Sequence, residues 1–94
     1  MYIINLTYTK STDIVDKVLP RHINFLDKYY KANKFICSGR KNPRSGGIIL
    51  CNSNNLDEVK SIISEDPFNI EKVANYEIIE FQPTKYADEF KAFI

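Results

Sequence analysis

The order of strand-like and helix-like segments is the feature that most constrains the fold of this 94-residue chain. β-Branched and aromatic residues dominate Tyr2–Tyr8, and from Ile14 to Asn33 apolar residues recur every three or four positions. Two short apolar runs, Phe35–Gly39 and Gly47–Ser53, come next, separated by a polar loop that contains Pro and Gly. This half of the chain therefore predicts a strand, a helix and a hairpin, with Asn33 as a left-handed helix stop.

The second half of the chain predicts one more helix and one more strand. Asn54 or Asn55 caps the helix, and Pro67 stops its apolar pattern. The last strand spans Asn75 to Gln82, and a short amphipathic segment covers Tyr86–Ile94. The order βαββαβ, right-handed crossovers and the pairing of neighbouring elements favour a single α+β domain over residues 1–94, with a helical extension at about 86–94. We expect the ferredoxin-like arrangement, a four-stranded antiparallel sheet with both helices on one face.

The other face of this sheet also carries apolar residues. A sheet covered on one side should alternate apolar and polar residues, but Ile3-Ile4, Ile48-Ile49-Leu50 and Ile78-Ile79 place apolar side chains on both faces. A chain this short buries only about 60 to 65% of its unfolded surface, so association would add to a limited core. We therefore predict a homodimer, sheet against sheet.

Composition and motifs exclude several classes of partner. The formal net charge is +1, and no basic stripe of the kind that nucleic acids require is present. No apolar run approaches the roughly 20 residues of a membrane span, and the N-terminal segment does not resemble a signal peptide, so we expect a soluble, cytoplasmic protein. One His and two Cys cannot complete a four-ligand zinc site, and no nucleotide-binding glycine motif occurs. Neither a metal nor another cofactor is expected.

The two cysteines, Cys37 and Cys51, fall in the two arms of the expected hairpin. If they lie opposite each other across it, a disulfide is geometrically conceivable. Free Cys is a common core residue, and cytosolic thiols stay reduced. Reduced, buried thiols are therefore the favoured prediction.

The only histidine, His22, lies where the helical pattern calls for an apolar residue. It is four residues after Val18 and four before Leu26, and Asp66 in the same way continues the inward face of the second helix beyond Ile63. If the two side chains meet, Asp66 would orient the imidazole and fix its tautomer. Such a pair suits proton abstraction next to a carbonyl, or elimination or isomerisation of a small phenolic or lactone-like compound. The alternative is a hydrogen-bonded core histidine and a turn-forming aspartate.

Two further sets of residues are candidates for a binding site. One set consists of aromatic residues that either line a pocket or belong to the ordinary core of the domain and its rim: Tyr8, Tyr29, Tyr30 and Phe68. The loop Arg40–Arg44 either closes over an anionic substrate through its cationic side chains or is a solvated hairpin loop.

Several short strings, taken in order, resemble the YciI-like family over nearly the whole chain. They are Leu19-Pro20-Arg21-His22, Phe35-Ile36-Cys37-Ser38-Gly39, Gly46-Gly47, Glu65-Asp66-Pro67-Phe68 and Tyr76-Glu77-Ile78-Ile79-Glu80-Phe81. The resemblance implies dimeric α/β barrels of the ferredoxin-like type, related in shape to muconolactone isomerases and small cofactor-free monooxygenases. One class in that family is linked to dehydrochlorination of a chlorinated hydroxyquinol.

The resemblance also implies where the active site lies. The family's His and Asp fall on His22 and Asp66, with Ser38 and Gly39 at the nearby strand end. Many relatives carry Arg where this chain has Leu19, and Pro where it has Arg40. We therefore expect Arg21 or Arg40 to take over the anchoring of substrate, with Phe68 as a further substrate-binding residue.

Three classes of function follow from these residues. The first is a cofactor-free enzyme of small-molecule metabolism that acts through His22 and Asp66. The second is a non-catalytic module that binds a small ligand in the same cleft, and the third is purely structural association. An enzyme or a binding module requires the pair to face an open cavity, whereas a structural pair would be closed off and fully hydrogen-bonded.

Overall fold

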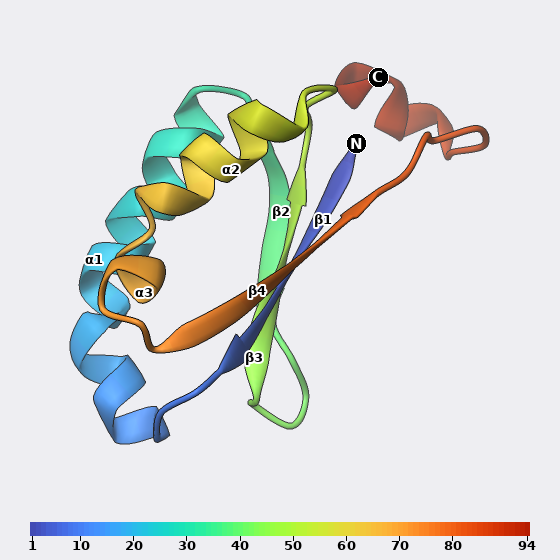
Figure 1. Cartoon of the computed structure of the whole chain (residues 1–94). Coiled ribbons are helices and arrows are strands. Elements are labelled where there is room, and N and C mark those ends of the chain that lie inside the picture. The colour runs from blue at the N-terminus through green and yellow to red at the C-terminus, as the bar shows by residue number, and fades with distance from the viewer.

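The computed structural model describes residues 1–94 and has two layers, with the helices packed on one face of a single sheet (Figure 1). The elements in chain order are β1 (Tyr2–Tyr8), α1 (Thr12–Lys31), β2 (Phe35–Arg40), β3 (Gly46–Cys51), α2 (Leu56–Ser64), α3 (Pro67–Ile70), β4 (Ala74–Glu80) and the 3₁₀ helix η1 (Asp88–Phe93). The predicted βαββαβ order is confirmed. A short extra helix, α3, lies between α2 and β4.

The sheet has the strand order β2-β3-β1-β4, and all three neighbouring pairs are antiparallel. The first strand is therefore central, with Ile4 opposite Ile49 on one side and Ile78 on the other. This is the ferredoxin-like arrangement that the order of elements predicts.

The core lies between the sheet and the helices. Alternate residues of β1 are buried against the helices, as expected for a strand with one covered face. The helix α1 buries one stripe, Val15, Val18, His22 and Phe25. Fifteen buried residues form one cluster: Tyr2, Ile4, Leu6, Val15, Val18, Phe25, Phe35, Ile49, Cys51, Val59, Ile62, Ile63, Phe68, Val73 and Ala74.

The long helix α1 ends as the sequence predicts. Pro20 lies inside α1, which continues to Lys31, so this proline neither ends nor restarts the helix. Asn33 has φ 59°, the left-handed conformation that stops many helices. The next helix, α2, is capped by Asn55, whose side chain accepts hydrogen bonds from two backbone N–H groups.

Asp66 is not on α2, which corrects the prediction that it continues that helix's inward face. The helix ends at Ser64, and Asp66 adopts an extended conformation and caps α3, with Pro67 at the first helical position. The physical reason is Pro67, because proline disfavours the helical conformation in the residue before it. The side chain still points inward, and Asp66 is 0% exposed.

The two cysteines do not lie opposite each other. A β-bulge between Phe35 and Cys37 shifts the register, so that Cys51 lies opposite Phe35 and Cys37 lies opposite Leu50. Both thiols are free; Cys51 is buried and Cys37 is exposed. The reduced state of the thiols stays a prediction, whereas the prediction that both are buried is wrong for Cys37.

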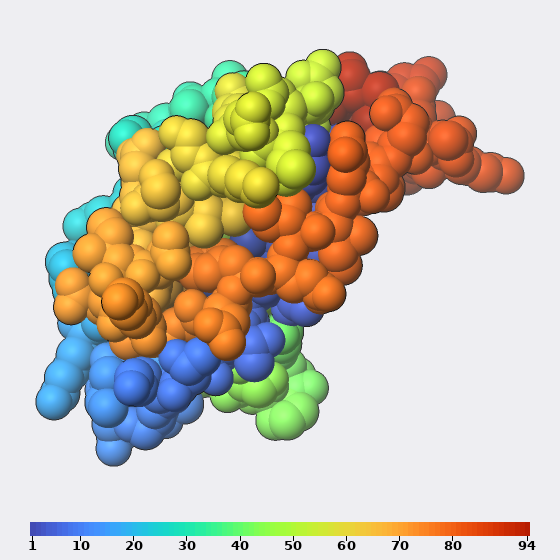
Figure 2. Space-filling model, in the orientation of Figure 1, coloured from blue at the N-terminus to red at the C-terminus, as the bar shows by residue number.

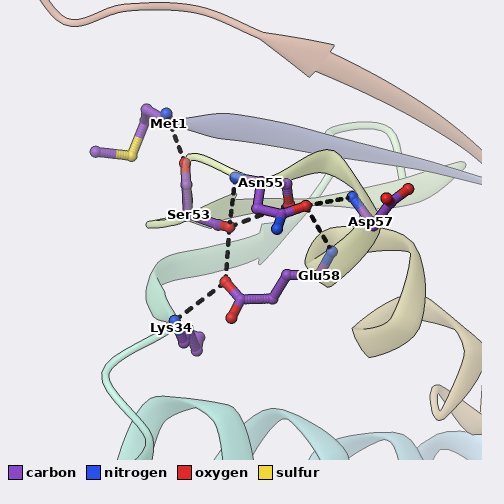
Figure 3. Close-up of polar contacts among 6 residues, drawn as sticks. All are labelled: Met1, Lys34, Ser53, Asn55, Asp57 and Glu58. Carbon is purple, nitrogen blue, oxygen red and sulfur yellow. Dashed lines mark hydrogen bonds and ion pairs between the residues drawn. The ribbon is translucent and has the colours of Figure 1, made fainter.

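A polar network fastens the edge of the domain where β1 begins (Figure 3). The amino group of Met1 donates a hydrogen bond to the carbonyl oxygen of Ser53 at 3.0 Å, and the Ser53 hydroxyl donates to Glu58 at 2.7 Å. Lys34 also contacts Glu58, at 3.0 Å. These contacts join β1, the connection between α1 and β2, and the start of α2.

The outer face of the sheet, opposite the helices, carries a row of apolar side chains. Ile3 lies between Leu50 and Ile79 in this row, and Ile48 and Ile79 are 38% and 43% exposed. Beside the row, Asn5 Nδ2 donates to Glu77, while Asn5 Oδ1 is buried without a hydrogen-bond partner. The apolar outer face predicted from the sequence is therefore present.

The C-terminal segment projects beyond the end of β4, as the orange and red atoms in Figure 2 show. It contains η1, whose Phe90 ring contacts the rings of Tyr86 and Phe93 with centroid distances of 6.4 and 5.4 Å. None of the helices in the structure combines the length and the apolar character needed to cross a membrane.

Candidate active site

His22 and Asp66 form a hydrogen-bonded pair between α1 and the start of α3. The distance from His22 Nδ1 to Asp66 Oδ1 is 2.7 Å, and the two residues are 8% and 0% exposed. A carboxylate oxygen accepts the hydrogen bond, so Nδ1 of the imidazole carries the proton. In the neutral ring, Nε2 is then an unprotonated acceptor. The predicted meeting of these two side chains is confirmed.

The Asp66 carboxylate accepts two further hydrogen bonds that fix its orientation. The backbone N–H of Phe68 donates to Oδ1 at 3.0 Å, and the Tyr76 hydroxyl donates to Oδ2 at 2.5 Å. Burial, and then the charge of Asp66 and the hydrogen bond to it, raise the pKa of Tyr76 far above its usual value. Tyr76 therefore remains a hydroxyl donor to the carboxylate over the whole working range of pH.

Tyr76 is a site residue that the sequence analysis missed. It belongs to β4 and shares the inner face of the sheet with Ala74 and Ile78, because alternate residues of a strand point to the same face. The sequence does show a hydroxyl-bearing side chain at a position that alternates with the core residues of this strand. The hydrogen-bond partner of the Tyr76 hydroxyl could not be inferred from the sequence, because the partner depends on how α3 packs on β4.

Aromatic contacts fix the plane of the His22 ring. Phe68 stacks on it with a centroid distance of 3.9 Å and an interplanar angle of 7°. Tyr8 meets Phe68 edge to face at 5.9 Å, and Phe25 lies 5.9 Å from His22. Together with the hydrogen bond to Asp66, these contacts hold Nε2 in one direction.

The histidine lines a cavity of about 270 Å³ that is open to solvent. Eight of its 15 lining residues are hydrophobic, and the walls include Leu19, Ile23 and Leu26 from α1. Cavities that bind small molecules share this mainly apolar lining with a few polar groups. From the sequence, His22 could face either a cavity or a closed core, and the structure places it at a cavity.

The glycines that open β3 shape the floor of the cavity. A side chain at Gly46 would overlap the carbonyl oxygen of Leu6, so β1 and the start of β3 approach closely only because this residue is glycine. Gly47 lies opposite Leu6 and Arg40 and adds no side chain to the floor. Gly47 is therefore part of the cavity lining and leaves its space open.

Four of the five predicted substrate-binding residues line this cavity, namely Ser38, Gly39, Arg40 and Phe68. The Ser38 hydroxyl is hydrogen-bonded to that of Tyr30 at 2.6 Å. Arg21 does not line the cavity, and its guanidinium lies 3.8 Å from Glu71. Adjacent residues of a helix point about 100° apart, so Arg21 is directed away when its neighbour His22 faces inward.

Of the four aromatic residues predicted from the sequence, two line the cavity and two do not. Tyr8 and Phe68 line the cavity, while Tyr29 and Tyr30 do not. The Tyr29 hydroxyl instead donates to Glu65 at 2.5 Å, and its ring packs against Phe35.

A second arginine, Arg44, reaches the cavity from the loop between β2 and β3. Its Nη2 lies 2.5 Å from Asp16 Oδ1 on α1, and its guanidinium lies 5.7 Å from the centre of the Tyr8 ring. The hydrogen bond from Arg44 lowers the pKa of Asp16 below its usual value. The ion pair therefore joins the hairpin loop to α1 beside the cavity. No three His, Cys, Asp or Glu side chains lie together in a way that could hold a metal ion.

Comparisons with known proteins identify the fold and the sequence family. A family model described as the YCII-related domain matches residues 1–82. The solved structure of 5-chloro-2-hydroxyhydroquinone dehydrochlorinase from Burkholderia phenoliruptrix AC1100, in complex with 2,5-dihydroxybenzoquinone, superposes with a TM-score of 0.72. The match covers 87% of this chain and 94% of that one, at 15% sequence identity, a level at which the likeness shows the fold. No curated protein sequence matches the chain.

Proposed function

The chain belongs to the YCII-related domain family, and from this premise we propose that the protein is a cofactor-free enzyme of small-molecule metabolism. His22 transfers a proton to or from the substrate, and Asp66 positions His22. The observation that carries this proposal is the geometry of the imidazole, whose Nδ1 is held by a buried carboxylate while the ring lines an open cavity.

The surroundings of His22 support its role as a general base. When Nε2 accepts a proton, the positive charge that forms on the ring lies 2.7 Å from the Asp66 carboxylate, which stabilises it. Phe68 N–H and the Tyr76 hydroxyl keep the carboxylate oriented through this step. The proton comes from a carbon next to a carbonyl or from a phenolic hydroxyl, and the reaction is an elimination or an isomerisation.

The size and lining of the cavity favour a small ring compound. A cavity of about 150 Å³ is enough to hold benzene, and this cavity has about 270 Å³. Phe68, which stacks on His22, lines the same cavity as Ser38, Gly39 and Arg40. The structural neighbour acts on a chlorinated hydroxyhydroquinone and was solved with a dihydroxybenzoquinone. We take a phenolic or lactone-like compound as the substrate class.

The first experiment is a turnover assay with 5-chloro-2-hydroxyhydroquinone and a panel of phenolic acids and lactones. We expect at least one compound to react, and the rate to fall by about 10²- to 10⁴-fold in His22→Ala, the usual contribution of a general acid or base. Asp66→Asn should also lose activity, whereas Arg21→Gln, a matched change outside the cavity, should retain it. Compounds that bind without any turnover in the wild type would favour the alternative, a non-catalytic ligand-binding module.

We also propose that two copies pair through the outer faces of their sheets. The exposed apolar side chains of Ile48 and Ile79, with Ile3 in the same region, support this assembly. Analytical ultracentrifugation at micromolar concentration should show a dimer for the wild type and a monomer for Ile79→Glu. A wild type that sediments only as a monomer would contradict the assembly.

A cytoplasmic location completes the proposal. Both cysteines are free, which agrees with a reducing compartment.

A further inference from the structure

We propose that the compound bound in this cavity carries a carboxylate, held jointly by Arg40 and Arg44 while the reactive end faces His22. This inference rests on the function proposed above and names its substrate class more narrowly.

The charge of the cavity wall favours an anionic ligand. Among the 15 lining residues are two arginines and one histidine, but no aspartate or glutamate. A cavity that presents two guanidinium groups without a lining carboxylate attracts anions and disfavours cations. Asp16, which lies outside the lining, forms an ion pair with Arg44, so a neutral ligand would leave Arg40 without a carboxylate in contact.

The guanidinium of Arg40 has no partner within the chain. Its side chain forms neither an ion pair nor a hydrogen bond, although the arginines Arg21 and Arg44 both contact carboxylates. Arg40 lies opposite Gly47, on the inner face of the sheet that it shares with Ser38. Its planar group of five N–H donors is suited to a carboxylate, which it binds through two parallel hydrogen bonds.

The guanidinium of Arg44 is held by Asp16 through one nitrogen only. Asp16 contacts one guanidinium nitrogen, Nη2, so other donors of Arg44 remain available. Asp16 itself shows that a carboxylate can approach this guanidinium. A ligand carboxylate would therefore meet Arg40 from the sheet and Arg44 from the hairpin loop.

The positions of these groups define the substrate. The carboxylate lies at the arginines, the apolar walls formed by Leu19, Ile23 and Leu26 contact a ring, and the acidic hydrogen faces His22. The two cations also favour proton loss, because they stabilise the negative charge that develops on the ring.

The test compares 4-hydroxybenzoate with its neutral counterpart, 4-hydroxybenzamide, by isothermal titration calorimetry at low ionic strength. For the wild type we expect the carboxylate to bind at least about tenfold more tightly than the amide, a difference of about 1.4 kcal/mol. Arg40→Gln and Arg44→Gln should each weaken binding of the carboxylate and leave binding of the amide unchanged. Asp16→Asn should strengthen carboxylate binding, because it removes the negative charge that competes for Arg44.

The control is Arg21→Gln, which removes the same charge from the protein outside the cavity and should change neither affinity. Equal affinities for the two compounds in the wild type, no detectable binding of 4-hydroxybenzoate at millimolar concentration, or a preference that survives in both Arg40→Gln and Arg44→Gln would overturn the inference. His22→Gln separates the two proposals, because it should keep the preference for the carboxylate even though turnover is lost. If turnover depends on His22 but the wild type does not prefer 4-hydroxybenzoate to the amide, only the inference that the ligand carries a carboxylate is overturned.

Discussion

The hydrogen bond from the Tyr76 hydroxyl to Asp66 is the contact of the site whose removal has the most clearly predictable effect on stability. It donates at 2.5 Å to Oδ2 of Asp66, while His22 and the Phe68 N–H both bind the other oxygen. In Tyr76→Phe, Oδ2 of a side chain that is 0% exposed keeps no hydrogen-bond donor. Leaving a buried acceptor unsatisfied costs about 1–3 kcal/mol, and a charged group costs more. We therefore expect the free energy of unfolding to fall by about 2–3 kcal/mol.

Urea denaturation followed by far-UV circular dichroism measures this loss at a fixed protein concentration. A domain of this size has a stability of about 5–15 kcal/mol, so the variant should still fold. Tyr30→Phe is the matched control, because its hydroxyl bonds to the exposed Ser38 hydroxyl at 2.6 Å. A neutral hydrogen bond of this kind contributes about 0.5–1.5 kcal/mol. The reasoning is refuted if Tyr76→Phe loses no more stability than Tyr30→Phe does.

Two further predictions concern thiol chemistry and acid stability. Burial raises the pKa of the Cys51 thiol to about 11, so in native protein at pH 8 a thiol reagent should modify no more than one thiol per chain, Cys37, and none in Cys37→Ser; rapid modification of two thiols per chain would contradict the burial of Cys51. Hydrogen bonds from Ser53 and Lys34 lower the pKa of Glu58 below its usual value of 4.5. The Glu58 carboxylate therefore stabilises the fold fully above pH 4.5, and this stabilisation is lost as the pH falls through the lowered pKa. Urea titrations between pH 6 and about 3 should therefore show a steeper loss of stability for the wild type than for Glu58→Gln, and parallel curves would contradict this assignment.

The fold could be predicted because local patterns specify its elements. The three- and four-residue spacing in α1 determines which side of the helix is buried. The β-branched and aromatic residues of β1 mark it as a strand. Asn33 and Asn55 mark a helix end and a helix start through their own backbone chemistry. Once the order of elements is known, few arrangements of so short a chain remain.

The details of the site depended on contacts that no local pattern specifies. The sequence brought His22 and Asp66 into consideration, but Asp66 reaches the histidine as the cap of α3 rather than from α2. Tyr76 meets Asp66 only because β4 pairs beside β1 in one register. The β-bulge before Cys37 likewise decides which residues of β2 face inward, and so places Ser38 and Arg40 at the cavity.

The most direct test of the central claim is the protonation state of the two His22 ring nitrogens, observed by two-bond ¹H–¹⁵N correlation NMR. Because the chain has a single histidine, its signals are unambiguous. For the neutral ring we predict a proton on Nδ1 and none on Nε2, with the Nε2 resonance shifting when 2,5-dihydroxybenzoquinone is added. In Asp66→Asn the preference for this tautomer should weaken. A neutral ring protonated on Nε2, or an Nε2 resonance that no cavity ligand moves, would contradict the claim that His22 exchanges a proton with a substrate in this cavity.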